Sequence, residues 1–316
     1  MKKKLIIIYG PTTSGKTSLS IKLAKRLKTE IISADSRQVI EGLDIGTGKF
    51  SKLDLIKKEK RYWLIDNIKV NLYDVILPSQ TYSVSDFNKD TQNVINNIFM
   101  TKDVGIIAGG TGLYVSSLLN SIESIEIAPD QALRNRLAKK SLLELTTYLN
   151  KISPEKYQNL NFSDQHNPRR IIRAIEVFLN SQNLQKNEPV ANKYDCFFIY
   201  LKPDKEILRL RIDSWYQEKL RMGLIEEVKL LKTQHSDEIL NSIGLVYREV
   251  NRYLNEEISK EYLDIHLPIA IYKYAKNQLT WMRKTKNAHV YEINSQNIDT
   301  IQNDIQTDVL DWYNNK

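Results

Sequence analysis

Cysteine is almost absent from this chain, since Cys196 is the single one among 316 residues. One cysteine cannot form an internal disulfide or a cysteine-based zinc site, which excludes both and is typical of a reducing compartment. Cys196 begins the apolar run 196–201, so we expect a buried structural thiol there and not a nucleophile.

Long hydrophobic runs are also missing near the amino terminus. The longest apolar run there covers residues 5–9, whereas a membrane-spanning helix needs about 17 residues or more. No signal-peptide cleavage pattern follows this run. We therefore expect a soluble cytoplasmic protein without a membrane partner. The sequence contains neither an internal repeat nor a low-complexity segment.

Positive charge is in moderate excess. The chain has 46 Lys and Arg against 38 Asp and Glu, a net charge of +8. This balance is compatible with a polyanionic partner, but a lysine-rich proteome would produce the same totals, so charge alone does not select that partner. A hydrophobic content of 41% in a chain of this length can bury a full core, which indicates one large domain carrying a smaller one.

The motif around which the chain is organised lies at residues 10–17. It matches the phosphate-loop pattern G-x-x-x-x-G-K-[ST] at every fixed position, between a strand expected at 4–9 and an amphipathic helix expected at 18–27. Backbone N–H groups of such a loop bind an anion, while Lys16 adds a charge and Thr17 a hydroxyl for Mg²⁺. The loop alone does not distinguish a nucleotide from another diphosphate. The phosphate-binding candidates are Gly10, Pro11, Thr12, Thr13, Ser14, Gly15, Lys16 and Thr17.

Two further strand ends are expected beside this loop. A strand at 30–33 leads into the turn 34–38, and a strand at 104–108 leads into a glycine-rich turn at 109–114 that opens a helix. Ligands of doubly wound sheets bind beyond the carboxyl ends of the strands, so Asp35 should face the same site as the phosphate loop. The turn at 109–114 is weak evidence by itself, because such turns more often serve helix–strand packing.

The connections between these strands are less regular. Residues 42–49 and the lysine-rich stretch through Arg61 read as an irregular loop near the mouth of the site, or as a solvated connection. Ser85 is expected to cap a helix. The apolar face of that helix would contain Phe87, Val94, Ile95 and Ile98.

The alternation of strand and helix stops between about 124 and 188. Helices are expected at 134–149 and 154–160. We interpret 124–188 as a helical insertion into a core formed by residues 1–123 and 189–316.

An arginine cluster lies within this insertion. Asn167 can cap a helix with Pro168 in its first turn, and Arg169, Arg170 and Arg173 follow near its start. Three guanidinium groups can bind phosphates, but the residues alone favour a solvated basic face paired with Glu176.

The remainder of the chain reads as one strand and several helices. A strand is expected at 196–201, then helices at 204–220, 224–233, 246–254 and 268–284, and finally a short strand and an acidic amphipathic helix. In the helix 268–284, basic residues alternate with Tyr272, Tyr274 and Trp281. This pattern suits a nucleic-acid surface, although the aromatic residues could equally belong to the core.

Taken together, these motifs resemble the tRNA dimethylallyltransferases, the isopentenyl-tRNA transferase (IPP transferase) family, over residues 4–283. The matching stretches are 10–17, 33–38, 42–47, 82–87, 109–114, 167–177, 274–276 and 278–281. The resemblance implies an α/β fold with a P-loop, kinase-like parallel sheet flanked by helices, and a helical insertion domain that contacts tRNA. The sequence says little about oligomeric state, and a monomer is the default expectation.

The resemblance also implies an activity. A dimethylallyl group would pass from dimethylallyl diphosphate to N6 of an adenosine next to the anticodon of tRNA, with Mg²⁺ as cofactor. Diphosphate leaves readily when N–H groups, Lys16 and Mg²⁺ hold its developing charge, and Thr17 matches the metal ligand. Asp35 matches the general base for the attacking amine, and the adenosine must be flipped out of its stack to reach it.

Residue by residue, the resemblance places a set of side chains along the tRNA. These are Asp35, Ser36, Arg37, Gln38, Thr111, Arg134, Arg169, Arg170, Ile171, Ile172, Arg173, Tyr247 and Arg248. The chain departs from the family pattern where Trp215 replaces an arginine associated with the diphosphate, and where Val246 replaces a glycine. Further departures are Tyr62-Trp63, Ile271-Tyr272-Lys273 and Asn277.

Three other functions share part of this pattern. Prenylation of a free adenine nucleotide would use the same loop and base without the long insertion. An ATP-dependent small-molecule kinase would use the loop without the other motifs. A weakly active or non-catalytic tRNA-binding paralogue would explain the departures. The insertion and its arginines favour tRNA as the acceptor.

Overall fold

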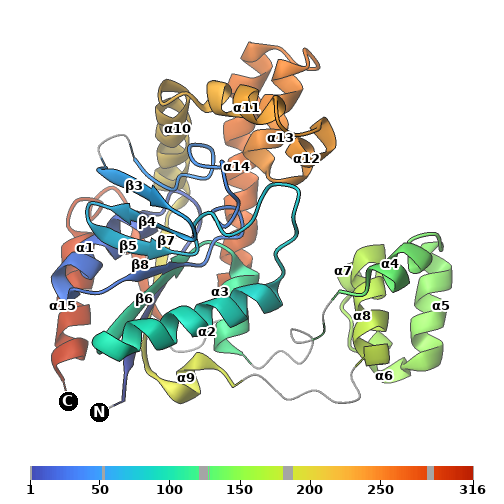
Figure 1. The fold of residues 1–316 in the computed structure, drawn as a ribbon, viewed down its shortest axis with the longest axis horizontal. Helices are drawn as coiled ribbons and strands as arrows, with labels where there is room; N and C mark the ends of the chain where they lie inside the picture. Colours follow the sequence, from blue (N-terminus) through green and yellow to red (C-terminus); the bar gives the residue numbers. More distant parts are fainter. Residues whose placement is uncertain are drawn as a thin grey trace. The chain divides into compact units, whose positions relative to one another are not determined.

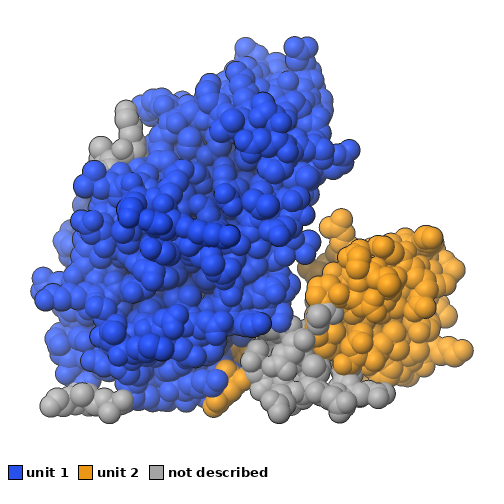
Figure 2. Space-filling view, viewed as in Figure 1, with its two compact units in different colours: residues 1–119, 189–316 blue, residues 120–188 orange. Residues whose placement is uncertain are grey.

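The chain divides into two compact units, residues 1–119 with 189–316 and residues 120–188 (Figure 2). The structure is a computed structural model that describes residues 2–51, 54–120, 127, 129–180, 188–282 and 288–315. In the described residues, the larger unit contains the sheet and the smaller unit is helical.

A mostly parallel sheet forms the centre of the larger unit. Its strands are β1 (Lys4–Tyr9), β2 (Ile31–Ser33), β3 (Ile56–Glu59), β4 (Tyr62–Ile65), β5 (Ile68–Asn71), β6 (Val104–Gly109), β7 (Asp195–Pro203) and β8 (His289–Ile293). They lie in the order β3-β4-β5-β2-β6-β1-β7-β8. Neighbours from β5 to β8 pair in parallel, whereas β4 pairs antiparallel with β3 and β5. The predicted α/β fold class is confirmed.

Helices cover both faces of the sheet, which is why β1 is buried from Leu5 to Tyr9. Ile6 and Ile8 belong to a core shared with α1 (Lys16–Leu27) and α15 (Ile301–Asn314). Leu5 and Ile7 belong to the opposite core, shared with α2 (Val84–Thr101) and α3 (Gly112–Leu119). Side chains alternate along a strand, so a strand buried on both faces reads as the continuous apolar run seen in the sequence.

Five more helices form a third core in the larger unit. They are α10 (Lys205–Arg221), α11 (Leu224–Lys232), α12 (Asp237–Ser242), α13 (Leu245–Leu254) and α14 (Lys260–Met282). Figure 1 shows α11, α12 and α13 together at one end of this unit. Their core includes Ile212, Val228 and Leu267, and also Val39 and Leu43 from the segment after β2. This packing brings the helices to the carboxyl end of the sheet.

The smaller unit consists of short helices around its own core. They are α4 (Gln131–Leu137), α5 (Leu142–Ile152), α6 (Pro154–Gln158), α7 (Phe162–Gln165) and α8 (Pro168–Asn180). The next helix, α9 (Val190–Lys193), belongs to the larger unit and precedes β7. Leu133, Leu145 and Ile175 are buried in this core. Asn167 caps α8 as predicted, because its side-chain oxygen accepts the N–H of Arg169 at 3.1 Å.

Helix starts differ from the sequence predictions in three places. Ser83, and not Ser85, caps α2, because Ser83 and Asp86 form a reciprocal capping box. The helix expected at 134–149 is two helices, since a second capping box at Ser141 starts α5. Pro268 lies inside α14, where the buried stripe continues across it from Leu263 and Leu267 to Ile271 and Ala275. Residues 283 and 284, the expected end of that helix, lie outside the described residues.

Residues 42–49 contain no helix or strand, as the reading of an irregular loop predicted, but two features of 42–61 differ from the irregular or solvated connection that was expected. Residues 56–59 form β3, which pairs with β4 at the edge of the sheet. Lys49 is fully buried, and its ammonium group donates to the carbonyl oxygen of Ile40 and to the carboxylates of Asp44 and Asp74. The segment 42–49 is therefore a structural part of the fold, held by buried charge pairs that the sequence did not reveal.

Cys196 lies in β7 and is half-buried. Burial raises the pKa of its thiol to about 12, which keeps it protonated and fits a structural role. As for membranes, none of the helices in the described part of the chain is both long enough and apolar enough to span one.

Candidate active site

Three turns meet at the carboxyl edge of the sheet. The phosphate loop follows β1, the turn 34–38 follows β2, and a glycine-rich turn follows β6. The three strands are neighbours in the order β2-β6-β1, so their turns lie side by side. With residues of α10 and α14 they line a cavity of about 600 Å³. Open α/β sheets bind their ligands at this place.

The phosphate loop has the features of an anion site. α1 starts directly after Gly15, whose φ of +95° lies in the left-handed region that favours glycine. The first N–H groups of a helix have no partner within the helix. The hydroxyl groups of Thr13 and Ser14 are buried, and neither has a hydrogen-bond partner in the described residues. Because unpaired buried hydroxyls are unfavourable, the loop fits a phosphate that would accept from them.

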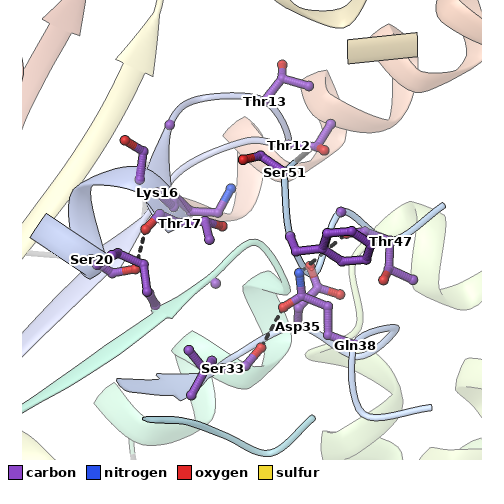
Figure 3. Close-up of a pocket in the computed structure, with 18 of the residues that line it drawn as sticks. Thr12, Thr13, Lys16, Thr17, Ser20, Ser33, Asp35, Gln38, Thr47 and Ser51 are labelled. Atoms are coloured by element: carbon purple, nitrogen blue, oxygen red, sulfur yellow. Dashed lines mark hydrogen bonds between the residues drawn. The ribbon is translucent and has the colours of Figure 1, made fainter. Parts of the chain in front are cut away.

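Lys16 and Asp35 place opposite charges in the same cavity. The Lys16 ammonium group donates to the carbonyl oxygen of Pro11 at 2.7 Å, so it lies over its own loop. Burial lowers the pKa of Lys16 to about 8, and the carboxylate of Asp35 opposes part of this shift. Figure 3 shows Lys16, Thr17 and Asp35 around one space. Asp35 thus faces the loop, as the sequence predicted.

The backbone of its own turn holds Asp35. Its Oδ1 accepts the N–H of Arg37 at 2.9 Å. The N–H of Ser36 donates to Oγ1 of Thr111 at 2.9 Å, which joins this turn to the turn after β6. Arg37 is exposed, whereas Ser36 and Thr111 connect two turns of the protein.

Gln38 is 8% exposed, and it lines the main cavity while it links two segments of the protein. Its Oε1 accepts from the hydroxyl of Ser33 at 2.7 Å, and its Nε2 donates to the carbonyl oxygen of Thr47 at 3.3 Å (Figure 3). Gln38, which was predicted to contact the nucleotide, therefore also connects β2 to the segment 42–49.

A second pocket of about 120 Å³ adjoins the main cavity. Arg37, Val246 and Tyr274 are among the residues that line only this pocket. The residues that line both spaces are Thr12, Asp35, Thr47, Trp215 and Gln278. Asp35 therefore stands where the two spaces meet, so its carboxylate is available to molecules that occupy either one.

Tyr247 is a buried residue in the wall of this second pocket. It is 2% exposed, and its hydroxyl donates to the carboxylate of Glu227 at 2.7 Å. The same carboxylate accepts the N–H groups of Ile45 and Gly46 at 2.6 and 3.0 Å, which fixes the segment next to Thr47. In the sequence, Glu227 is marked only by its place on an amphipathic helix. Arg248, in contrast, is exposed and pairs with a neighbouring glutamate.

Arg211 was missed by sequence reasoning and lies at the phosphate loop. Its guanidinium group donates to the carbonyl oxygen of Ser14 at 2.9 Å and lines the main cavity. Trp215 stands one turn later on the same face of α10 and lines the cavity too. α10 has Trp215 where the family pattern has an arginine. Through Arg211 it still brings a guanidinium group to the loop.

Two of the predicted tRNA-binding arginines are bound to a buried carboxylate of the smaller unit. Glu176 is fully buried, and Arg134 donates to it through Nε at 2.9 Å and Nη2 at 2.7 Å. Arg173 also pairs with Glu176. A buried carboxylate requires such partners, so both arginines have a structural role.

The other predicted positions on α8 differ in exposure. Arg170 pairs with Asp164, and Ile171 and Ile172 are buried in the core of the smaller unit. Arg169 is exposed, and its guanidinium group has no partner among the described residues. Arg169 is thus the arginine of this cluster that is most available to an external phosphate.

The donor groups at the cavity fit a Mg²⁺ ion held mainly by a substrate. The described residues contain no group of three or more His, Cys, Asp or Glu side chains that could enclose a metal. Thr17 lines the cavity beside Lys16 and offers a hydroxyl oxygen. Mg²⁺ keeps several waters and commonly binds through substrate phosphates and few protein ligands, so this sparse set is compatible with it.

Comparisons with known proteins agree on one family. Residues 38–285 match the family model described as IPP transferase. A tRNA dimethylallyltransferase of Alkaliphilus oremlandii is 36% identical over 96% of this chain and 95% of its own length. The solved structure of a tRNA isopentenylpyrophosphate transferase from Bacillus halodurans is similar with a TM-score of 0.69, at 29% identity over 98% of this chain and 96% of that one. A eukaryotic dimethylallyltransferase acting on tRNA, 21% identical, has the same fold with a TM-score of 0.77 over 98% of this chain and 80% of that one.

Proposed function

The chain belongs to the IPP transferase family and transfers a dimethylallyl group to tRNA, and from this premise we propose the donor, the acceptor atom and the roles of the residues. The donor is dimethylallyl diphosphate. The acceptor is N6 of the adenosine next to the anticodon. The protein acts in the cytoplasm as a monomer.

The observation that carries this proposal is the place of Asp35 between the two spaces. The diphosphate occupies the main cavity, and the flipped adenine enters the smaller pocket beside Arg37 and Tyr274. The N6 amine forms a bond to the allylic carbon while the bond from that carbon to the diphosphate oxygen breaks. Asp35 accepts the proton that the amine loses.

The phosphate loop stabilises the leaving group. Negative charge develops on the diphosphate as the bond breaks, and preorganised donors lower the energy of that charge. Lys16 and Arg211 supply positive charge, and the buried hydroxyls of Thr13 and Ser14 supply donors. Thr17 would hold Mg²⁺, which supplies additional charge neutralisation when bound. Lys16 must leave the carbonyl oxygen of Pro11 to reach the diphosphate.

The tRNA contacts we propose are fewer than the family pattern implies. Arg37, Arg169 and Arg248 are exposed, and Lys273 and Lys276 are exposed on α14, which also bears Tyr274. Arg134, Arg173 and Tyr247 act indirectly, because each is committed to a carboxylate within the protein.

One assay tests the proposed function as a whole. The protein is incubated with Mg²⁺ and labelled dimethylallyl diphosphate, together with unmodified tRNA, AMP or no acceptor, and ATP consumption is measured in parallel. Label in tRNA, at N6 of the adenosine next to the anticodon, is the expected result. Label in AMP instead would favour the free nucleotide as acceptor, and ATP consumption without label transfer would favour a kinase.

We expect the rate to fall at high pH because of Lys16. Its pKa is lowered from 10.5 to about 8, so the protonated form that binds diphosphate is lost as the pH rises through about 8. The value of kcat/KM for dimethylallyl diphosphate should decrease above this pH. The Lys16→Arg variant should lack this decrease, since a guanidinium group stays charged. A wild-type profile that stays flat to about pH 10 would contradict the assignment.

Substitutions of Arg169 and Arg173 should affect different properties. The first should change tRNA binding and the second the stability of the protein. Arg169→Ala should weaken tRNA binding and reduce the slope of log Kd against log salt by about 0.7–0.9, with unchanged unfolding. Arg173→Ala removes a partner of buried Glu176, so it should destabilise the protein by about 1–3 kcal/mol. Salt titrations of tRNA binding and thermal unfolding measure both effects. An unchanged slope for Arg169→Ala would mean that this arginine is only solvated.

A further inference from the structure

Gln278 joins two turns of the active site through one buried side chain. It lies on α14 and is 6% exposed. Its Oε1 accepts the N–H of Thr12 in the phosphate loop at 2.8 Å, and its Nε2 donates to the carbonyl oxygen of Gly110 at 2.8 Å. An amide can make this pair of bonds because it has a donor and an acceptor at the same end.

The fit between Gln278 and Gly110 is close. A Cβ atom added to Gly110 would lie 2.7 Å from Nε2 of Gln278 and 3.6 Å from Nζ of Lys16. The turn after β6 therefore leaves room for the amide in its present place because residue 110 is a glycine, whereas the distance to Lys16 is that of an ordinary contact. This explains the glycine at position 110, in a turn that the sequence pattern left open between packing and ligand binding.

The bonds of Gln278 continue to Asp35. Gly110 precedes Thr111, whose N–H donates to the carbonyl oxygen of Ala34 at 3.2 Å and whose Oγ1 accepts the N–H of Ser36 at 2.9 Å. The chain of contacts thus leads from the phosphate loop through Gln278 and the turn after β6 to the two neighbours of Asp35. Tyr274, one turn before Gln278 on α14, lines the second pocket.

We propose that Gln278 is a positioning residue that sets the phosphate loop in register with the turn that bears Asp35. It determines where the diphosphate lies relative to the carboxylate of Asp35, and it does so through its hydrogen bonds to Thr12 and Gly110. This inference rests on the proposed function, in which the loop binds the diphosphate and Asp35 takes the proton.

Three variants test it. Gln278→Met keeps the length of the side chain and removes both hydrogen bonds. Gln278→Glu keeps the acceptor for Thr12 but turns a second acceptor toward the carbonyl oxygen of Gly110. Asn277→Ala, at the exposed neighbouring position, is the matched control. The measurements are Kd for inorganic pyrophosphate with Mg²⁺, Kd for tRNA, the KM of each substrate, kcat and thermal unfolding.

We expect Gln278→Met to weaken pyrophosphate binding about tenfold and to raise the KM of the allylic donor similarly, because a buried N–H and a buried carbonyl oxygen lose their partner. The value of kcat should fall about 10–100-fold, since small misplacements of reacting groups are costly. Tight tRNA binding should remain. Gln278→Glu should show the same direction of change, and it carries the test if the methionine variant does not fold. Asn277→Ala should behave as wild type.

Two results would overturn the inference. Unchanged pyrophosphate binding and kcat in both Gln278 variants would mean that the bridge is dispensable. Loss of tRNA binding with normal pyrophosphate binding would make Gln278 an RNA contact instead. Failure of the proposed function is recognised separately, because the wild-type protein would then not label tRNA, whereas pyrophosphate binding can still be compared between the variants.

Discussion

Asp35→Asn is expected to slow transfer of the dimethylallyl group to tRNA by about 10²–10⁴-fold, the usual contribution of a general base. The amide oxygen of asparagine can still accept the N–H of Arg37, so the turn should keep its shape. An amide cannot accept the amine proton, so only the chemical step of the reaction should be slowed. Single-turnover rates with enzyme in excess over tRNA measure this step, and tRNA affinity should change little.

Asp54→Asn is the matched control for Asp35. Asp54 also lines the main cavity, but it does not line the second pocket, and its carboxylate accepts the N–H of Ser51 at 2.7 Å. Asp54→Asn removes the same charge from the same cavity but leaves Asp35 in place. Transfer should therefore stay near the wild-type rate. Equal losses in the two variants would mean that the charge of the cavity matters and that Asp35 is not the base.

Lys16→Ala should reduce kcat by about 10²–10³-fold and weaken binding of pyrophosphate. The reason is that Lys16 supplies charge where negative charge develops on the leaving group, in a site where burial keeps water from substituting for it. Arg211 would remain to hold part of the diphosphate, so binding should weaken without disappearing. Rapid-quench kinetics and calorimetry with pyrophosphate measure the two effects.

Lys25→Ala provides the control for this variant. Lys25 lies on the same helix and lines the same cavity, but it forms an ion pair with Asp66 at 2.9 Å. Exposed ion pairs contribute little, so both activity and stability should be close to wild type. If Lys16→Ala retained full kcat, the loop would bind dimethylallyl diphosphate without stabilising the departing diphosphate.

Local signals predicted much of the fold. β1 was recognised from its apolar run, and α1 from the periodicity after the loop, because both depend on neighbours in sequence. The edge hairpin of β3 and β4 was missed, since residues such as Lys57 and Lys58 are exposed on its outer strand and carry no apolar alternation. Pro268 was read as a helix start because a proline normally is one, but buried leucines on the preceding turn hold the helix together.

The same division holds for the active site. By itself, the sequence determined the phosphate loop and the placement of Asp35 after a neighbouring strand, since a strand, its turn and the next helix are encoded within about twenty residues. Only the tertiary structure decided that Arg134 and Arg173 serve buried Glu176, that Arg211 reaches the loop, and that Gln278 joins Thr12 to Gly110. These partners are far apart in the chain, and their energies depend on burial, which no local pattern of residues specifies.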